Sequence, residues 1–296
     1  MTYEEFKYIL DQFPKLKWIG LTGIGESFIN KDFVKILKLV KSRGIYIELF
    51  DTFFFIEEKL ANKIIDLEVD KLILSMDAAT KETYEKIRKG ANFDNIIKNI
   101  SNFIKIKKQK KAHFPELEVH FIVNNLNYKE IPDYIRLAHK LGINGVVRFT
   151  SLLHGFNKIK KYEKEIPQEI IDKTNKIADE LDMKVAWNKN IPPSHKRKPI
   201  TDCTWWIMPF IFVTGHVIPC CSGNEANRRY FQKKYSLGNV FEKPFKEIWN
   251  SKKYRKFRKD VHEGKTPIQC IDCRAYNCPV DINSWAYKRF IKETNK

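Results

Sequence analysis

Residues 18–27 read Trp18-Ile19-Gly20-Leu21-Thr22-Gly23-Ile24-Gly25-Glu26-Ser27. The first half is a short apolar run, typical of a buried strand, and the glycines that follow indicate a turn. A helical pattern at 32–43 and a second apolar run at Tyr46–Phe50 come next. This order of strand, helix and strand predicts a βα unit with two parallel strands.

The same unit recurs through the first two thirds of the chain. Strands that are apolar along their whole length indicate a sheet covered on both faces. We therefore expect an α/β fold, a partial (β/α) barrel, with an open doubly wound sheet as the alternative. The predicted strands are Trp18–Thr22, Tyr46–Phe50, Lys71–Met76, Glu118–Val123 and Gly145–Phe149, and the predicted helices lie near 32–43, 57–67, 80–110 and 129–141.

The chain opens with a helix signal and not with a strand. Thr2 and Glu5 form a capping-box pattern, and Phe6 and Ile9 follow at helical spacing. A βα barrel normally begins with a strand. We therefore expect the barrel to lack its first strand, either because the sheet is shorter by one or because a segment upstream of Met1 has been lost.

Composition indicates a globular protein of 296 residues, with 43% hydrophobic and 30% charged residues. No run of apolar residues is long enough to cross a membrane, and the first residues form no secretory signal. We therefore expect a cytoplasmic protein without membrane contact. The net charge of +18 is interpreted as lysine-rich solvated faces, and a dedicated nucleic-acid surface is the less favoured alternative.

All six cysteines lie after residue 202. Clustered thiols with C-x2-C spacing are typical of soft-metal and iron–sulfur sites, especially in a reducing compartment. Spacing alone leaves an iron–sulfur cluster, zinc and buried thiols all open. The cysteines are Cys203, Cys220, Cys221, Cys270, Cys273 and Cys278.

Candidate binding residues follow the predicted strands, at the edge where βα folds bind ligands. Gly23 and Gly25 let backbone approach a ligand, and Glu26 can accept a hydrogen bond from an ammonium group. The alternative there is a plain turn with a solvated glutamate. Ser75 and Asp77 lie on one strand face, where they suit ribose hydroxyls or an amino acid, unless Asp77 only caps the next helix.

Four further polar residues lie within or at the ends of the predicted helices and strands. Arg88 lies in the basic last turn of a predicted helix, and a carboxylate-binding role is the second interpretation. Asn124 ends the fourth predicted strand and shares a face with His120, which we expect to be packed and hydrogen-bonded. Arg148 lies within a strand, where a guanidinium needs an anion or a water-filled cavity. None of these residues can be assigned a catalytic role.

Two of these segments resemble a known family. Leu21–Asp32 resembles the glycine–glutamate motif of radical S-adenosylmethionine enzymes, and Ser75–Phe93 resembles the family's fourth-strand segment. The resemblance covers about residues 1–185. It departs from the family in two places. The Thr-Asn-Gly often found after the third strand reads Asp51-Thr52-Phe53, and the C-x3-C-x2-C loop that holds the S-adenosylmethionine-cleaving [4Fe–4S] cluster is absent.

The resemblance implies a binding site for S-adenosylmethionine. In the family the glutamate binds the ammonium group, which matches Glu26, and polar residues at the end of the fourth strand bind the ribose or methionine moiety. The cleaving cluster would be present only with a further N-terminal segment. The expected site is Gly23, Gly25, Glu26, Ser75, Asp77, Arg88 and Asn124.

The cysteine-rich tail resembles the SPASM or twitch extension of the same family over residues 203–278. Shared features are Gly215-x4-Cys220, Gly238-Asn239, Ile248-Trp249-Asn250-Ser251 and Cys270-x2-Cys273. The tail lacks the final cysteines of the full seven-cysteine version, so the resemblance implies one auxiliary [4Fe–4S] cluster. The expected ligands are Cys203, Cys220, Cys270 and Cys273, with Cys221 and Cys278 in reserve.

We expect a partial barrel at 1–185, a linker at 186–202 and an iron–sulfur domain with a closing helix at 203–296. The resemblance implies an oxidoreductase or modifying enzyme that acts on a peptide or small molecule and receives electrons from a donor such as ferredoxin or flavodoxin. Without cysteines in the barrel, we expect these residues alone to be inactive in radical generation. The alternative is a non-catalytic module, stabilised by an iron–sulfur cluster or zinc, that binds a peptide or RNA.

Overall fold

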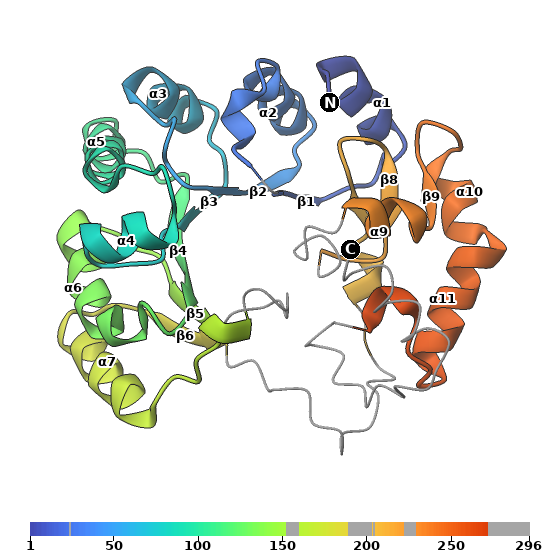
Figure 1. Ribbon diagram of the computed structural model, residues 1–296. Coiled ribbons are helices and arrows are strands. Elements are labelled where there is room, and N and C mark those ends of the chain that lie inside the picture. The colour runs from blue at the N-terminus through green and yellow to red at the C-terminus, as the bar shows by residue number, and fades with distance from the viewer. Residues whose placement is uncertain (24, 152–159, 189–202, 204, 222–228, 272–296) are drawn as a thin grey trace.

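The larger part of the chain is built around one parallel sheet (Figure 1). Six strands lie in chain order, each paired in parallel with the next, so the predicted α/β fold is confirmed. The strands are β1 (Trp18–Leu21), β2 (Tyr46–Asp51), β3 (Lys71–Ser75), β4 (Glu116–Val123), β5 (Val147–Ser151) and β6 (Val185–Asn188). The computed structural model describes residues 1–23, 25–151, 160–188, 203, 205–221 and 229–271.

Helices lie along the outer side of the sheet, which curves into an arc as a partial barrel does (Figure 1). The sequence did not predict β6 or the last of these helices. β6 carries the sheet to Asn188, three residues into the expected linker. No described helix is both long enough and apolar enough to cross a membrane. The helices are α2 (Phe33–Ser42), α3 (Glu58–Asp66), α4 (Lys81–Ile87), α5 (Phe93–Gln109), α6 (Ile131–Leu141) and α7 (Gln168–Glu180).

The two faces of the sheet differ in polarity. Side chains such as Leu49 and Phe121 are fully buried in the core beneath the helices. Their neighbours along the strands, among them Glu48, Glu118 and Arg148, point to the opposite, inner face because side chains alternate in a strand. Among the described elements, helices α2 to α7 lie along the outer side of the sheet (Figure 1). The inner face is therefore more polar than was expected for strands that are apolar along their whole length.

A second, smaller core lies beside β1. It contains the three-stranded antiparallel sheet β7 (Phe210–Ile211), β8 (His216–Ile218) and β9 (Gly238–Asn239). Val217, Ile248 and Tyr254 are at most 3% exposed in this core. The helices of this part are α9 (Arg229–Lys234), α10 (Phe245–Asn250) and α11 (Lys252–His262).

Helix α1 (Tyr3–Asp11) joins the two cores. Its predicted capping box is present, with the Glu5 amide donating to Thr2 Oγ1 at 3.2 Å and the Thr2 amide donating to Glu5 Oε2 at 2.7 Å. Leu10 packs in the core of the parallel sheet, whereas Ile9 packs in the second core. Just after the helix, Gln12 Oε1 accepts the amide of Phe245 at 2.6 Å. The helix therefore fixes the C-terminal part against the sheet.

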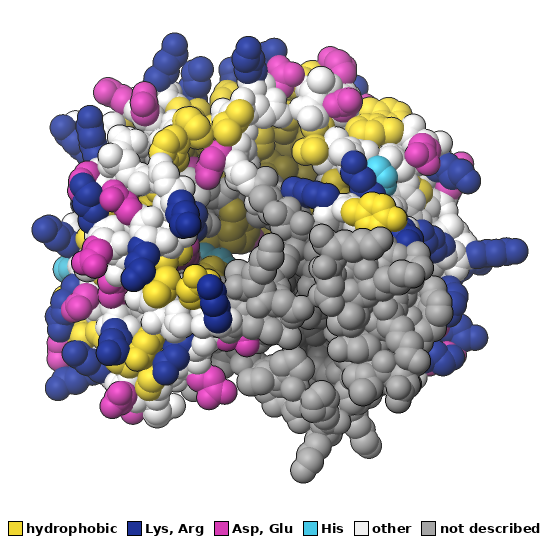
Figure 2. Space-filling view, in the orientation of Figure 1, with side chains coloured by type: hydrophobic (Ala, Val, Ile, Leu, Met, Phe, Trp, Pro, Cys, Tyr) yellow, Lys and Arg dark blue, Asp and Glu magenta, His cyan; other side chains and the backbone are white. Residues whose placement is uncertain are grey.

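Charged side chains are spread over the surface. On the face shown in Figure 2, Lys and Arg lie all around the rim of the described part, interspersed with Asp and Glu. Elsewhere in the described part of the chain, individual cations have acidic partners, for example Lys7 with Asp11 at 2.8 Å and Lys110 with Asp66 at 2.6 Å. The basic composition is therefore distributed and partly paired.

Candidate functional site

Glu26 follows β1 and faces the end of β2. Gly25 turns the chain with φ of 108°, a conformation that glycine adopts without strain. The Thr52 hydroxyl donates to Glu26 Oε2 at 2.9 Å. A Cβ atom placed on Gly23 would meet nothing within 4 Å. The half-buried carboxylate thus lies beside accessible backbone, an arrangement suited to a cationic amine.

Asp77 and Arg88 form an ion pair across the end of β3. The Arg88 Nε and Nη2 atoms donate to Asp77 Oδ2, at 2.9 and 2.6 Å. The other carboxylate oxygen accepts the amide of Ile122 at 2.9 Å. Asp77 is only 6% exposed, and both of its oxygens are engaged. Its contacts tie together β3, the end of α4 and β4.

The charges of Glu26 and Arg88 act on each other. Burial by itself lowers the pKa of Arg88, but the neighbouring carboxylates of Asp77 and Glu26 outweigh it, so the pKa is raised. Tyr84, whose ring centroid lies 5.9 Å from the guanidinium, has its pKa raised to about 12, chiefly by burial. A carboxylate that follows β1 and a guanidinium held beside the end of β3 therefore lie at the same edge of the sheet, with β2 between the two strands.

Asp51 ends β2, and Thr52 and Phe53 follow it. Phe53 stands where the family pattern has glycine. Its φ of 64° lies in the left-handed region, which is unfavourable for a residue with a side chain. The fully buried ring packs 5.4 Å from that of Phe103, and Asp51 Oδ1 accepts the Phe53 amide at 2.6 Å. Burial raises the pKa of Asp51 to about 7. The hydrogen bond from the Phe53 amide opposes this rise, and the negative charge of Glu26 adds to it. These contacts hold a glycine-like turn that lets Thr52 reach Glu26.

The loop after β4 is held by asparagine side chains. Fully buried Asn127 donates from Nδ2 to the carbonyls of Asp77 and Ile122, both at 2.8 Å, and accepts the amide of Asn124 at 2.7 Å. Asn124 itself closes a turn, since its Oδ1 accepts the amide of Leu126 at 2.9 Å. Asn127 was not among the predicted residues. The Asn124-Asn125-Leu126-Asn127 run after a strand is the signal that could have revealed it.

Glu130 fixes the start of α4. It was not among the residues predicted from the sequence. Its Oε2 accepts the amides of Ala79 and Thr80, at 2.8 and 3.2 Å, and its Oε1 accepts the hydroxyls of Thr80 and Thr83. A carboxylate at the N-terminus of a helix is favoured by the helix dipole. Because Arg88 is the C-cap of the same helix, Glu130 sets the position of the guanidinium indirectly.

We expect Asn127→Ala to lower the free energy of unfolding by about 2–4 kcal/mol, because each buried group left without a partner costs about 1–3 kcal/mol. Urea denaturation followed by circular dichroism measures this. The control is Asn125→Ala at an exposed neighbour whose Nδ2 donates only to the Lys161 carbonyl, at 2.9 Å. Equal denaturation midpoints for the two variants would contradict the role assigned to Asn127.

Further polar groups lie on the inner face of the sheet. His120 Nε2 is 2.8 Å from Thr150 Oγ1, in keeping with the packed, hydrogen-bonded residue that was expected. Arg148 Nη2 lies 4.0 Å from Glu118 Oε2, and the other oxygen of Glu118 accepts from Lys71 Nζ at 2.7 Å. Arg148 thus has the anion that a guanidinium within a strand needs.

Four of the six cysteines lie among the described residues. Cys203, Cys220, Cys221 and Cys270 are all half-buried. Cys203 and Cys270 border the second core, and a charge on Cys220 acts on the phenol of Tyr254 within it. In the described part of the chain no three potential ligands are gathered around one point. Cys273 and Cys278 lie outside the described residues.

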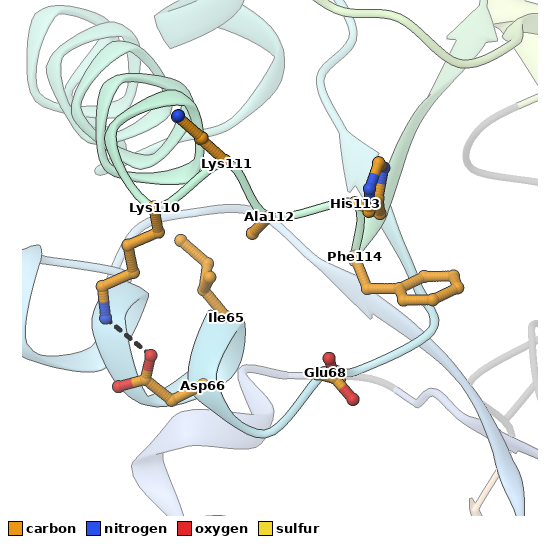
Figure 3. A pocket seen from close by; sticks show the side chains of 8 residues that line it. All are labelled: Ile65, Asp66, Glu68, Lys110, Lys111, Ala112, His113 and Phe114. Carbon is orange, nitrogen blue, oxygen red and sulfur yellow. Dashed lines mark hydrogen bonds and ion pairs between the residues drawn. The ribbon is translucent and has the colours of Figure 1, made fainter.

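A cavity of about 400 Å³ lies at the other edge of the sheet (Figure 3). Helices α3 and α5 end beside it, and the Lys110 ammonium reaches across to Asp66 at 2.6 Å. This edge carries the amino ends of β3 and β4, and none of the expected binding residues lines the cavity. The expected binding residues lie instead at the carboxyl ends of the strands. The lining residues are Ile65, Asp66, Glu68, Lys110, Lys111, Ala112, His113 and Phe114.

Comparison with known proteins gives matches to both parts of the chain. The SPASM family, described as an iron–sulfur cluster-binding domain, matches residues 203–278. One relative is the tungsten-containing aldehyde ferredoxin oxidoreductase cofactor-modifying protein of Pyrococcus furiosus. Its sequence is 27% identical over an alignment 307 residues long, which covers 96% of this chain and 83% of that protein.

Two solved structures share the fold. SuiB of Streptococcus suis matches with a TM-score of 0.64 and 12% identity, over 88% of this chain, which spans only 62% of SuiB. Native anSMEcpe with bound AdoMet and the Cp18Cys peptide matches with a TM-score of 0.60 and 15% identity, over 99% of this chain and 88% of that one.

Proposed function

Since the chain is a radical S-adenosylmethionine protein with a C-terminal SPASM domain, we propose that it binds S-adenosylmethionine at the carboxyl edge of its sheet. The observation that carries this proposal is that the Glu26 carboxylate and the Arg88 guanidinium lie at the same edge of the sheet, beside the ends of β1 and β3. The methionine end of S-adenosylmethionine is a zwitterion, so it needs an anion for its ammonium group and a cation for its carboxylate. Glu26 would supply the anion from the segment after β1, and Arg88 the cation from the end of α4.

The proposed role of each binding residue follows from the hydrogen-bonding atoms that its contacts within the chain leave available for a ligand. Glu26 would accept from the ammonium group, oriented by Thr52. Arg88 uses two of its five N–H donors on Asp77, which leaves donors for a carboxylate. Ser75, half-buried at the end of β3, would bind a ribose hydroxyl. The backbone at Gly23 and Gly25 would approach the ligand closely.

Asp77 and Asn124 receive a different proposed role from the one first expected. Both Asp77 oxygens and the Asn124 amide group are occupied by contacts within the chain. We assign them to positioning: Asp77 holds Arg88, and Asn124 shapes the loop that passes the site. They would affect S-adenosylmethionine binding through the residues that they hold.

Glu26→Gln is expected to weaken S-adenosylmethionine binding by about 10- to 100-fold, because a hydrogen bond to a charged group contributes about 1.5–3 kcal/mol. The amide can still accept from Thr52, so the loop is retained. Isothermal titration calorimetry measures the dissociation constant. Glu58→Gln, at an exposed glutamate in the first turn of α3, is the control that should bind normally. Unchanged affinity in the Glu26 variant would refute this site.

The C-terminal cysteines are proposed to hold one auxiliary [4Fe–4S] cluster. What supports this proposal is the type of donor, because soft thiolates are the usual ligands of such a cluster and Cys203 and Cys270 pack against one apolar core. Cys273 would complete the set, with Cys221 and Cys278 as reserves. When bound, such a cluster exchanges single electrons.

The substrate and electron donor are proposed from the relatives. The Pyrococcus furiosus protein is named as modifying a cofactor, and the anSMEcpe structure holds a peptide. We propose a peptide or small molecule that lies in the polar hollow of the sheet, near His120 and Arg148. Electrons would come from a ferredoxin or flavodoxin in the cytoplasm. A cluster that cleaves S-adenosylmethionine would need thiolates from outside residues 1–202, which contain no cysteine.

A further inference from the structure

The turn that follows β2 is held from two sides by buried polar side chains. Asp51, only 5% exposed, accepts the Phe53 amide with Oδ1 at 2.6 Å. Asn99, on α5 and also 5% exposed, donates from Nδ2 to the Phe53 carbonyl at 2.9 Å and to the Phe54 carbonyl at 3.4 Å. Both main-chain polar groups of Phe53 are therefore bound by side chains that are shielded from water.

Phe53 needs this support because of its backbone conformation. Its φ of 64° lies in the left-handed region, where a Cβ atom crowds the backbone. A residue in such a conformation persists only where the surrounding contacts hold it there. The fully buried ring supplies one contact, since its centroid lies 5.4 Å from that of Phe103 on α5. Without the Asp51 carboxyl group, we expect the turn to relax toward a negative φ.

Thr52 lies inside this turn and faces Glu26. Its hydroxyl donates to Glu26 Oε2 at 2.9 Å and accepts the Phe54 amide at 3.4 Å. A hydroxyl has one proton, and because the Phe54 amide approaches an acceptor position of the oxygen, that proton is directed to the carboxylate. Within the described part of the chain, the other Glu26 oxygen has no hydrogen-bond or ion-pair partner. One oxygen is thus held, and the other is left for a ligand.

We propose that Asp51 is a positioning residue for amine binding: it holds the Phe53 turn, the turn places the Thr52 hydroxyl, and the hydroxyl fixes Glu26. This inference rests on the proposed function, in which Glu26 accepts from the ammonium group of S-adenosylmethionine. A glutamate that is fixed before the ligand arrives loses less conformational freedom on binding, which raises the affinity. In the described contacts Asp51 and Glu26 share no hydrogen bond, so the effect of Asp51 passes through Thr52.

The test is a double-mutant cycle between Asp51 and Thr52, with the dissociation constant for S-adenosylmethionine measured by isothermal titration calorimetry. Asp51→Ala and Thr52→Val should each weaken binding by about threefold to tenfold, because each leaves the Glu26 side chain to be ordered by the ligand. The double variant should bind no more weakly than Thr52→Val alone, since a residue that acts through another adds nothing once the second is removed. Losses that multiply in the double variant would overturn the proposal.

Two further variants separate positioning from charge and from folding. Asp51→Asn removes the charge but keeps an oxygen that can accept the Phe53 amide, so it should recover most of the wild-type affinity. A loss as large as that of Asp51→Ala would show that the charge acts on the ligand directly, and would overturn positioning. If circular dichroism shows Asp51→Ala to be unfolded, the cycle is run with Asp51→Ser, whose hydroxyl is a weaker acceptor in such a turn. Its smaller loss should likewise vanish in the Thr52→Val background, and a loss that persists there would overturn the proposal.

A matched control removes a buried hydroxyl from another helix. Thr174, fully buried on α7, donates to the Ile170 carbonyl at 2.5 Å. Thr174→Val should bind S-adenosylmethionine normally, and a loss equal to that of Asp51→Ala would show that reduced stability alone weakens binding, which would overturn the role of Asp51. A wild-type chain that does not bind S-adenosylmethionine, or normal binding by Glu26→Gln, would overturn the proposed function together with this inference.

Discussion

Reconstituted anaerobically with iron and sulfide and then given S-adenosylmethionine and dithionite, the 296-residue chain is expected to release no 5′-deoxyadenosine above background. Reductive cleavage requires a cluster whose thiolate ligands lie next to the bound S-adenosylmethionine. The proposed pocket is built from residues between Gly23 and Asn124, and residues 1–202 contain no cysteine. Since thiolates are the usual ligands of iron–sulfur clusters, these residues cannot assemble the usual cleaving centre by themselves.

The expected result is the absence of a product, so positive controls are needed to show that the protein and the assay are intact. The same preparation should bind S-adenosylmethionine in a parallel calorimetric titration, which shows that the pocket is folded. A radical S-adenosylmethionine enzyme with its complete cysteine motif should form product under identical conditions. Release of several equivalents of 5′-deoxyadenosine per chain, dependent on dithionite, would show that cleavage occurs without barrel cysteines and would contradict this prediction.

The second large effect concerns the auxiliary cluster. Cys203→Ala and Cys270→Ala should each reduce bound iron from about four atoms per chain to a small fraction of that, because a [4Fe–4S] cluster normally needs four thiolates. Both cysteines border the second core. We also expect the variants to unfold more easily, since cluster binding contributes to folding.

The reserve cysteines are the matched controls for that experiment. Cys221→Ala and Cys278→Ala remove the same atoms from the same domain but should leave most of the iron in place. Iron analysis and the absorbance near 400 nm report on both sets. If Cys221→Ala loses iron while Cys220→Ala retains it, the assignment of ligands is wrong at that pair.

The sheet was predictable because its strands are short apolar runs separated by clear helical patterns. β1 to β5 were each found to within a few residues. β6 was missed because Val185–Asn188 is only four residues long, too short to show a period, and it pairs with β5 alone. The polar inner face was also missed: Glu48, Glu118 and Arg148 interrupt apolar runs, and which face the helices cover depends on how the chain curves.

The candidate site was predictable where a local motif carries it. Glu26 and Arg88 were predicted from short segments, but that they lie at the same edge of the sheet depends on the fold. Thr52, Asn127 and Glu130 could not be found in that way, because each acts on a residue that is 26 to 51 positions distant along the chain. Their partners are backbone groups and side chains at other strand ends. The positioning role proposed for Asp77 likewise depends on contacts made in the fold, with Arg88 and with the amide of Ile122.

The most direct test of the account is the amount of iron and acid-labile sulfide bound per chain after anaerobic reconstitution. A single auxiliary [4Fe–4S] cluster in a radical S-adenosylmethionine protein that lacks cysteines in its barrel predicts about four irons and four sulfides. A content of about eight would mean that a second cluster forms in this chain. One zinc without sulfide would contradict the iron–sulfur assignment outright.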